Sequence, residues 1–321
     1  MNKFASEKEA IDALAESYNR ITQQIGQVII GQNEVVKSVL IAIFSNGHCL
    51  LVGVPGLAKT LLVQTVSQVL DLSYNRVQFT PDLMPSDIIG SEILGEDRAF
   101  KFIPGPVFSN IILADEINRT PPKTQAALLE AMQEKMVTVG GKTHPLPQPF
   151  FVLATQNPIE QEGTYPLPEA QLDRFMFNVS LSYPSFAEEV QVVKNTTSNV
   201  TASLSHVLDG AQISYFQKLI RDIPVTDNVL EYAVSMAAKT RPGTSLATAE
   251  VNKFLSWGAG PRASQYLVLG AKCHAAIHGK YSPDKEDVQA VAEAILRHRI
   301  VRNYKAEAEG VSVETLIRQL F

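Results

Sequence analysis

Residues 53–60 constrain the fold of this chain more than any other segment. They follow a β-rich apolar run at 49–54 and precede a helical pattern at 61–70. A glycine-containing turn between a strand and a helix, ending in Lys-Thr, is the pattern of a phosphate-binding loop. In such a loop backbone N–H groups surround the phosphates, the lysine reaches the β/γ oxygens and the threonine hydroxyl binds Mg²⁺. The segment reads Gly53, Val54, Pro55, Gly56, Leu57, Ala58, Lys59, Thr60.

One position of this loop departs from the usual pattern. Ala58 stands where a glycine normally precedes the lysine. An alanine is small enough for the position if the local backbone is right-handed. Taken alone, the motif also admits a second interpretation, a tight glycine turn that binds nothing.

Two adjacent carboxylates end a second apolar run. Residues 110–116 read NIILADE, so Asp115 and Glu116 stand at the end of the predicted strand. The first carboxylate of such a pair can meet Mg²⁺, and the second can orient and activate an attacking water. An acidic pair at a strand end can also be a solvated turn. Its place after a phosphate loop, in the same predicted sheet, favours a nucleotide hydrolase.

A third strand, predicted over 150–156, leads to Asn157 and is ended by Pro158. An asparagine beside the phosphate loop can hydrogen-bond the γ-phosphate and the attacking water. The alternative is that Asn157 merely starts an Asn-Pro turn.

The predicted strands and helices divide the chain into two parts. Strands are expected at 49–54, 74–79, 111–115, 150–156 and 175–181. Several are continuous apolar runs separated by helical patterns, which is typical of a parallel sheet covered on both faces. Beyond residues 183–185 the chain becomes Ala-rich with helical periodicity at 212–222, 226–239, 246–257, 262–279 and 284–298. A boundary is therefore expected between 184 and 200, with 196–203 as a polar connector.

Composition limits the classes of partner. A length of 321 residues predicts about two domains, and a net charge of -5 gives no electrostatic reason to expect nucleic acid or an anionic membrane as a ligand. The longest apolar runs, such as 39–44, are far shorter than the ~20 residues of a membrane span. The first residues do not resemble a signal peptide, and two distant cysteines suggest no disulfide framework. We therefore expect a cytoplasmic protein.

Cys273, His274 and His278 form a possible metal-binding pattern on a predicted helix. The i, i+4 spacing suits metal ligation, but no third ligand is apparent. Helix packing and a helix-terminal turn are the favoured interpretation of these residues.

The motifs resemble those of AAA+ ATPases and, within them, of the MoxR family. Even Ala58 agrees with MoxR-type loops. The segments that carry the resemblance extend over nearly the whole chain and are 28–32 (VIIGQ), 53–60 (GVPGLAKT), 78–87 (QFTPDLMPSD), 114–125 (ADEINRTPPKTQ), 154–157 (ATQN), 168–175 (PEAQLDRF), 260–264 (GPRAS) and 296–300 (LRHRI).

The resemblance implies roles for individual residues. Asn157 would be the first sensor of the nucleotide, Arg174 an arginine finger that enters a neighbouring subunit's site, and Arg262 the second sensor on the lid. Without the resemblance, Arg174 would be taken for a surface ion-pair residue and Arg262 for a solvated first-turn residue. The remaining implied contacts are Gly31 and Gln32 with adenine, residues 53–61 (Gly53 to Leu61) with ATP, Thr60 and Asp115 with Mg²⁺, and Glu116 with the attacking water.

The resemblance also implies an architecture and partners. The expected fold is an α/β P-loop NTPase domain with a three-layer parallel sheet at 1–190, followed by an all-α lid domain at 191–321. Insertions near 80–109 and 137–148, the latter with a hairpin turn at Gly140-Gly141, are expected to contact substrate. The implied partners are a homo-oligomer, expected as a hexameric ring, and a client protein such as one with a von Willebrand factor type A domain. Two alternatives stay open: a related AAA+ motor acting on nucleic acid or as a chelatase subunit, and a nucleotide-switched scaffold.

Overall fold

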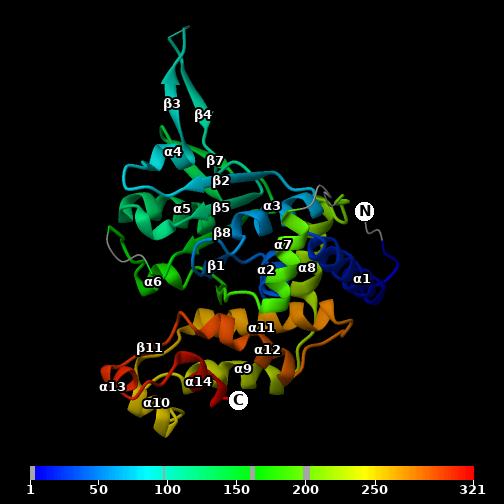
Figure 1. Ribbon diagram of the computed structural model, residues 1–321, viewed down its shortest axis with the longest axis vertical. Helices are drawn as coiled ribbons and strands as arrows, with labels where there is room; N and C mark the ends of the chain where they lie inside the picture. The colour runs from blue at the N-terminus through cyan, green and yellow to red at the C-terminus, as the bar shows by residue number, and fades with distance from the viewer. Residues whose placement is uncertain (1–3, 97, 160–162, 198–202) are drawn as a thin grey trace.

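The central element of the computed structural model is a five-stranded parallel sheet (Figure 1). The structure describes residues 4–96, 98–159, 163–197 and 203–321, so part of the predicted connector, 198–202, lies outside the described residues. All five predicted strands are confirmed in this one sheet. In spatial order they are β2 (Tyr74–Gln78), β5 (Ile111–Asp115), β8 (Phe151–Gln156), β1 (Cys49–Val52) and β9 (Phe177–Ser180).

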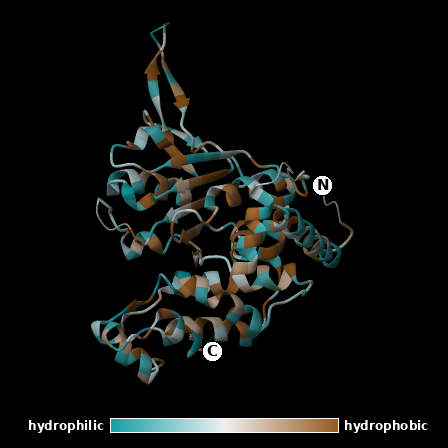
Figure 2. Ribbon diagram, in the orientation of Figure 1, coloured by the Kyte–Doolittle hydropathy of each residue, from teal (hydrophilic) through white to brown (hydrophobic). Residues whose placement is uncertain are grey.

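Alternate residues of the inner strands enter two separate apolar cores. Leu50 and Ala154 face a core that contains Leu128 of helix α5 (Pro122–Glu134), whereas Leu51 and Leu153 face a core that contains Val63 of helix α3 (Lys59–Val69). Strand side chains alternate between the two faces of a sheet, so a strand buried on both faces must be apolar throughout. The predicted three-layer arrangement is thereby confirmed, and Figure 2 shows apolar residues along the strands of the sheet and in helices on its faces.

Seven helices accompany the sheet in the described part of the chain before residue 200. They are α1 (Glu7–Gly26), α2 (Asn33–Phe44), α3 (Lys59–Val69), α4 (Pro85–Ile89), α5 (Pro122–Glu134), α6 (Glu169–Leu172) and α7 (Phe186–Thr196), with a 3₁₀ turn η1 (Ile117–Arg119) before α5. Ser185 caps α7 by accepting from the N–H of Glu188, whose carboxylate in turn accepts from the N–H of Ser185, a reciprocal pair typical of a helix start.

The C-terminal part is mainly helical, as predicted. Its elements are α8 (Gly210–Asp222), α9 (Asp227–Lys239), α10 (Ala249–Phe254), β10 (Leu255–Trp257), α11 (Pro261–Ile277), α12 (Lys285–Leu296), β11 (Val301–Arg302), α13 (Tyr304–Ala308) and α14 (Val313–Arg318). The predicted helix at 246–257 is confirmed only over 249–254, because residues 246–248 precede the helix and residues 255–257 are extended and pair with β11. The chain then passes close to the end of α9: a Cβ at Gly258 would lie 2.3 Å from the carbonyl oxygen of Thr240.

The two parts of the chain share one apolar core. Leu51 of β1 and Val39 of α2 belong to the same cluster as Phe216 of α8 and Leu267 of α11. The division at residues 190 and 191 stays a prediction. No helix in the described ranges combines the length and the apolar character needed to cross a bilayer.

Both predicted insertions contain β-hairpins. β3 (Gly90–Leu94) pairs with β4 (Phe100–Pro104), and β6 (Met136–Val139) pairs with β7 (Lys142–Pro145). Gly140 and Gly141 have φ of +57° and +76°, the positive values that a two-residue hairpin turn of this kind requires. Figure 1 shows the β3–β4 hairpin projecting from the sheet at the end of the molecule opposite the C-terminal helices.

Candidate functional site

The predicted phosphate loop lies between β1 and α3. The N–H of Gly53 donates to the carbonyl oxygen of Gln156 at 3.1 Å, which fixes the start of the loop against β8. A Cβ at Gly53 would lie 2.8 Å from the Cβ of Leu181, so the chain passes too close there for any side chain. Gly56 has φ +85° and open space around it. The loop therefore leaves a side where a phosphate can approach the backbone.

The backbone at Ala58 is left-handed, with φ +54° and ψ +25°. The condition under which an alanine was expected to fit, a right-handed backbone, is not met. A left-handed conformation costs an L-residue roughly 1–2 kcal/mol. A left-handed residue next to right-handed helical residues belongs to the backbone nests that bind anions. The strain is located where the loop turns into α3, as is common at ligand-binding sites.

Lys59 lies between the loop and the carboxylates that end β5. Its Nζ donates to the carbonyl oxygen of Gly53. Burial lowers the pKa of Lys59, and the nearby Asp115 and Glu116 act in the opposite direction. Thr60 follows in the first turn of α3, and Leu61 is partly exposed. The structure thus brings the predicted phosphate, metal and water ligands to one edge of the sheet.

Asp115 is held on both of its oxygens. Oδ2 accepts from Nη2 and Nε of Arg76 at 2.6 and 3.1 Å, and Oδ1 accepts from the hydroxyl of Thr155 at 2.7 Å. The same hydroxyl accepts from the N–H of Glu116 at 2.8 Å. Thr155 is fully buried, and it fixes both carboxylate residues from the neighbouring strand.

Glu116 has a left-handed backbone and a fixed side chain. Its φ is +57°, and Oε2 accepts from Nε2 of Gln78 at 2.8 Å and from Nη1 of Arg119 at 3.0 Å. Sequence reasoning did not single out Arg76, Gln78, Arg119 or Thr155. The available signal was their position: three of them stand near the carboxyl ends of predicted strands next to the one that carries Asp115.

Asn157 lies beside the loop but also makes a turn. It is 6% exposed, and its Oδ1 accepts from the N–H of Ile159 at 3.2 Å. The turn interpretation is therefore realised in the structure. A sensor role for Asn157 stays a prediction.

Gln32 connects the segment before α2 to the phosphate loop. Its Nε2 donates to the carbonyl oxygen of Leu57 at 3.2 Å, whereas its Oε1 is buried and makes no hydrogen bond within the described chain. Gly31 and Gln32 both have positive φ, +68° and +54°. A buried acceptor without a donor beside a phosphate loop fits a ligand that supplies an N–H group, as the amino group of adenine does.

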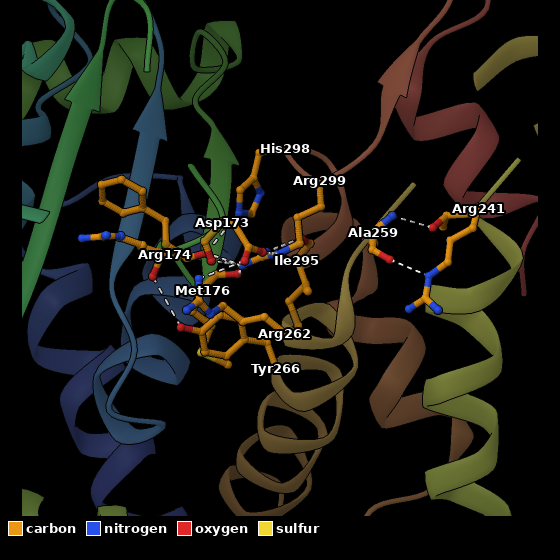
Figure 3. Close-up of polar contacts among 12 residues, drawn as sticks. Asp173, Arg174, Met176, Arg241, Ala259, Arg262, Tyr266, Ile295, His298 and Arg299 are labelled. Carbon is orange, nitrogen blue, oxygen red and sulfur yellow. Dashed lines mark hydrogen bonds and ion pairs between the residues drawn. The ribbon is translucent and has the colours of Figure 1, made fainter. Parts of the chain in front are cut away.

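None of the contacts described for the two predicted arginines joins them to the phosphate loop. Arg174 donates from Nη1 to the carbonyl oxygen of Leu129 on α5 at 2.6 Å, and Arg262 forms an ion pair with Asp173 at 2.9 Å. Figure 3 shows Arg174, Arg262 and Asp173 close together, where α11 meets the segment before β9. Their predicted roles as arginine finger and second sensor are not tested by these contacts.

The residues of the Cys-His pattern have other partners. Burial raises the pKa of the Cys273 thiol to about 12. His274 lies 2.7 Å from an oxygen of Asp287, and Nδ1 of His278 lies 2.6 Å from the carbonyl oxygen of His274. These contacts agree with the helix-packing interpretation.

Comparison with known proteins decides the family. Residues 48–177 match the family "ATPase family associated with various cellular activities (AAA)", and residues 247–320 match the AAA lid domain. The chain is 41% identical over 314 residues to Chaperone MoxR1 of Mycobacterium tuberculosis, covering 97% of this chain and 83% of that one. The chain belongs to the MoxR family of AAA+ ATPases. As a member of this family it is an ATP hydrolase with a nucleotide-binding AAA domain and a helical lid.

Other relatives agree with this family. Protein MoxR of Methylorubrum extorquens is 30% identical over 319 residues, covering 94% of this chain and 93% of that one. The crystal structure of a Cytophaga hutchinsonii protein superposes with a TM-score of 0.91 at 41% identity, covering 97% of this chain and 95% of that one. The MoxR-family resemblance predicted from the motifs is confirmed.

Proposed function

We propose that this MoxR-family ATPase hydrolyses Mg²⁺-bound ATP in order to remodel or mature a protein partner. The observation that carries the proposal is the convergence of Lys59 with Asp115 and Glu116 at the carboxyl edge of the sheet, beside the loop at 53–60. Ligands of parallel sheets bind at this edge. The set of a lysine and two carboxylates is what phosphoryl transfer to water requires.

Each residue of the set has a separate task. The loop's N–H groups and Lys59 bind the β- and γ-phosphates, and Thr60 and Asp115 would hold Mg²⁺. When bound, Mg²⁺ neutralises charge on the β- and γ-oxygens. Glu116 orients the attacking water and accepts its proton. Because Arg76 is bonded to Oδ2 of Asp115, it would compete with the metal for that oxygen.

Further residues complete the proposed site. The unpartnered Oε1 of Gln32 accepts from adenine, and Asn157 contacts the γ-phosphate and the water. Arg262 reports the nucleotide state to the lid. Arg174, bonded to α5 and not to its own loop, supplies positive charge to a neighbouring subunit's site. An arginine that acts in trans requires an oligomer, for which we propose a hexameric ring.

The surface that contacts the partner is proposed to include the two hairpins. On β3 and β4 four apolar side chains are exposed by 42% to 68%, which is unusual for a projecting hairpin unless something covers it. They are Ile93, Leu94, Phe100 and Ile103. The family resemblance favours a client with a von Willebrand factor type A domain. A cytoplasmic location stays a prediction.

Substitution of Glu116 tests the proposal. Glu116→Gln keeps the shape of the side chain but removes the base, so ATP binding is retained and steady-state hydrolysis falls by at least a hundredfold. Glu309→Gln is a matched control, because Glu309 pairs with Lys253 on the surface of the lid. Hydrolysis by Glu116→Gln close to that of the control would contradict the proposed base.

Capture of partners with Glu116→Gln held in ATP, followed by mass spectrometry, tests the second half of the proposal. A protein client is expected, and recovery of nucleic acid instead would overturn it. Deletion of residues 140–143 at the β6–β7 tip should abolish client remodelling and leave ATP binding intact. Loss of ATP binding in that variant would contradict a role of the hairpin that is confined to the client.

A further inference from the structure

The guanidinium of Arg299 is buried against the segment that carries Arg174. Arg299 is 6% exposed and follows α12 in the LRHRI segment at 296–300. A guanidinium has five N–H donors, and all five are used here. One donates to the carboxylate of Asp173 at 2.8 Å, three donate to carbonyl oxygens at 173, 175 and 176, and one donates to the carbonyl oxygen of Ile295.

Lid side chains bind four consecutive carbonyl oxygens around Arg174. Arg299 binds those of Asp173, Phe175 and Met176 at 2.7 to 3.2 Å. Tyr266 of α11 donates to the carbonyl oxygen of Arg174 itself at 3.4 Å. The backbone that bears Arg174 is therefore attached to the lid at every residue from 173 to 176 (Figure 3).

Neighbouring side chains keep Arg299 in place. Its guanidinium lies 5.1 Å from the ring centroid of Tyr266, a cation–π contact. His298 also contacts the segment, with Nε2 3.0 Å from the carbonyl oxygen of Phe175. Burial and the adjacent Arg299 lower the pKa of His298 well below its usual value, so this imidazole is neutral and donates through Nε2.

Asp173 is shared between two arginines of the lid. Oδ1 accepts from Arg299 and Oδ2 from Arg262, at 2.8 and 2.9 Å. The Arg299 side chain is 2% exposed, whereas that of Arg262 is 39% exposed. If Arg262 leaves Asp173 to meet a phosphate, Arg299 still holds Oδ1. The segment with Arg174 thus stays attached to the lid in either arrangement of Arg262.

We propose that Arg299 and Asp173 are positioning residues for Arg174. They attach the segment that carries Arg174 to the lid of the same subunit, while the Arg174 side chain serves the site of the neighbouring subunit. The inference rests on the proposed function, because it takes Arg174 to act in trans. Both residues act through the backbone that carries Arg174. Displacement of a catalytic group by about 1 Å can cost on the order of a hundredfold in rate.

Mixed oligomers test the proposal. Glu116→Gln subunits lack a working site but carry Arg174, and Arg174→Ala subunits carry a working site but lack the arginine. Mixing the two should restore hydrolysis at interfaces where a Glu116→Gln subunit supplies its Arg174 to the site of an Arg174→Ala subunit. Adding Asp173→Asn to the Glu116→Gln subunit should then reduce kcat by at least tenfold and change KM by less than twofold. Adding Asp173→Asn to the Arg174→Ala subunit instead should reduce kcat far less, because that subunit supplies no arginine and only its own Arg262 loses a partner.

Two further variants keep the result interpretable. Arg299→Lys in the Glu116→Gln subunit should also reduce kcat, since an ammonium cannot reach the three carbonyls and the carboxylate that the planar guanidinium binds. Glu309→Gln in the same subunit should change nothing. Light scattering on each mixture confirms that oligomers of equal size are compared.

The outcomes separate the inference from the function beneath it. If mixing restores hydrolysis and Asp173→Asn is harmless in the subunit that supplies Arg174, the positioning role is overturned while the trans role stands. The positioning role is also overturned if Asp173→Asn acts only in the subunit that supplies the site. If mixing Glu116→Gln with Arg174→Ala restores nothing, the trans role of Arg174 and the positioning role are both overturned.

Discussion

Replacement of Ala58 by glycine should stabilise this protein, although glycine usually destabilises. Ala58 is held at φ +54°, where an L-residue loses roughly 1–2 kcal/mol relative to its preferred conformations. Glycine avoids this strain but adds roughly 0.5–1 kcal/mol of conformational entropy to the unfolded chain. The net gain expected for Ala58→Gly is about 0.5–1 kcal/mol. For a chain of this length that corresponds to a Tm increase of about 1 °C, with an upper limit of about 1.5 °C.

The assay is thermal unfolding of the nucleotide-free protein followed by circular dichroism, at one fixed protein concentration because oligomerisation also shifts Tm. Two control substitutions should change Tm in the opposite direction. Ala13→Gly lies within helix α1, where glycine costs about 1 kcal/mol. Gly56→Ala places a Cβ in open space at φ +85°, so only backbone strain is added. A Tm for Ala58→Gly that falls as it does for Ala13→Gly would refute the assigned strain.

Three further results are expected at the site and in the sheet. Thr155→Val should lower the free energy of unfolding by about 1–3 kcal/mol in urea titrations and reduce kcat at least tenfold, because it leaves the N–H of Glu116 without its acceptor. Thr155→Ser keeps the hydroxyl and should lose far less stability and activity. Arg76→Gln should lower the Mg²⁺ concentration for half-maximal hydrolysis several-fold, since the guanidinium competes for Oδ2 of Asp115, and a higher requirement would contradict this competition. Burial lowers the pKa of His48 to about 4, so between pH 6.5 and 4 the unfolded chain binds a proton that the folded protein does not. The free energy of unfolding should therefore decrease by up to roughly 3 kcal/mol as the pH is lowered through this range. Urea midpoints at pH 7 and 5 check this. His48→Gln should reduce the difference between the two midpoints, and His298, whose pKa is also lowered by burial, accounts for a remaining part of the same sign.

Much of the fold follows from local patterns. The continuous apolar runs at 49–54, 111–115 and 150–156 located the three inner strands of the sheet, and the glycine pair at 140–141 located a hairpin. These features depend on neighbours in the sequence: a strand buried on both faces must be apolar at successive residues, and a two-residue turn needs positive φ at its centre. For the same reason the loop at 53–60, with its strand and helix, is recognisable from the order of its residues. This loop is one of the segments that carry the resemblance to the MoxR family.

Local patterns were less reliable where the chain meets distant segments. The helical period at 246–257 predicted a helix through residues 255–257, whereas these residues pair with β11. That pairing and the close approach of Gly258 to the end of α9 involve segments distant in the sequence. The hand of the backbone at Ala58 could not be read from alanine, which by itself prefers the right-handed region.

The sequence by itself determined which residues form the loop and which carboxylates end β5. Only the tertiary structure decided what holds them. Strand order placed Thr155 of β8 and Arg76 of β2 on either side of Asp115. Packing of the lid placed Arg299, more than 120 residues away in the chain, against the carbonyls around Arg174. Such contacts join side chains and backbone across elements, and they depend on which strands and helices become neighbours, a choice that the packing of the whole core makes.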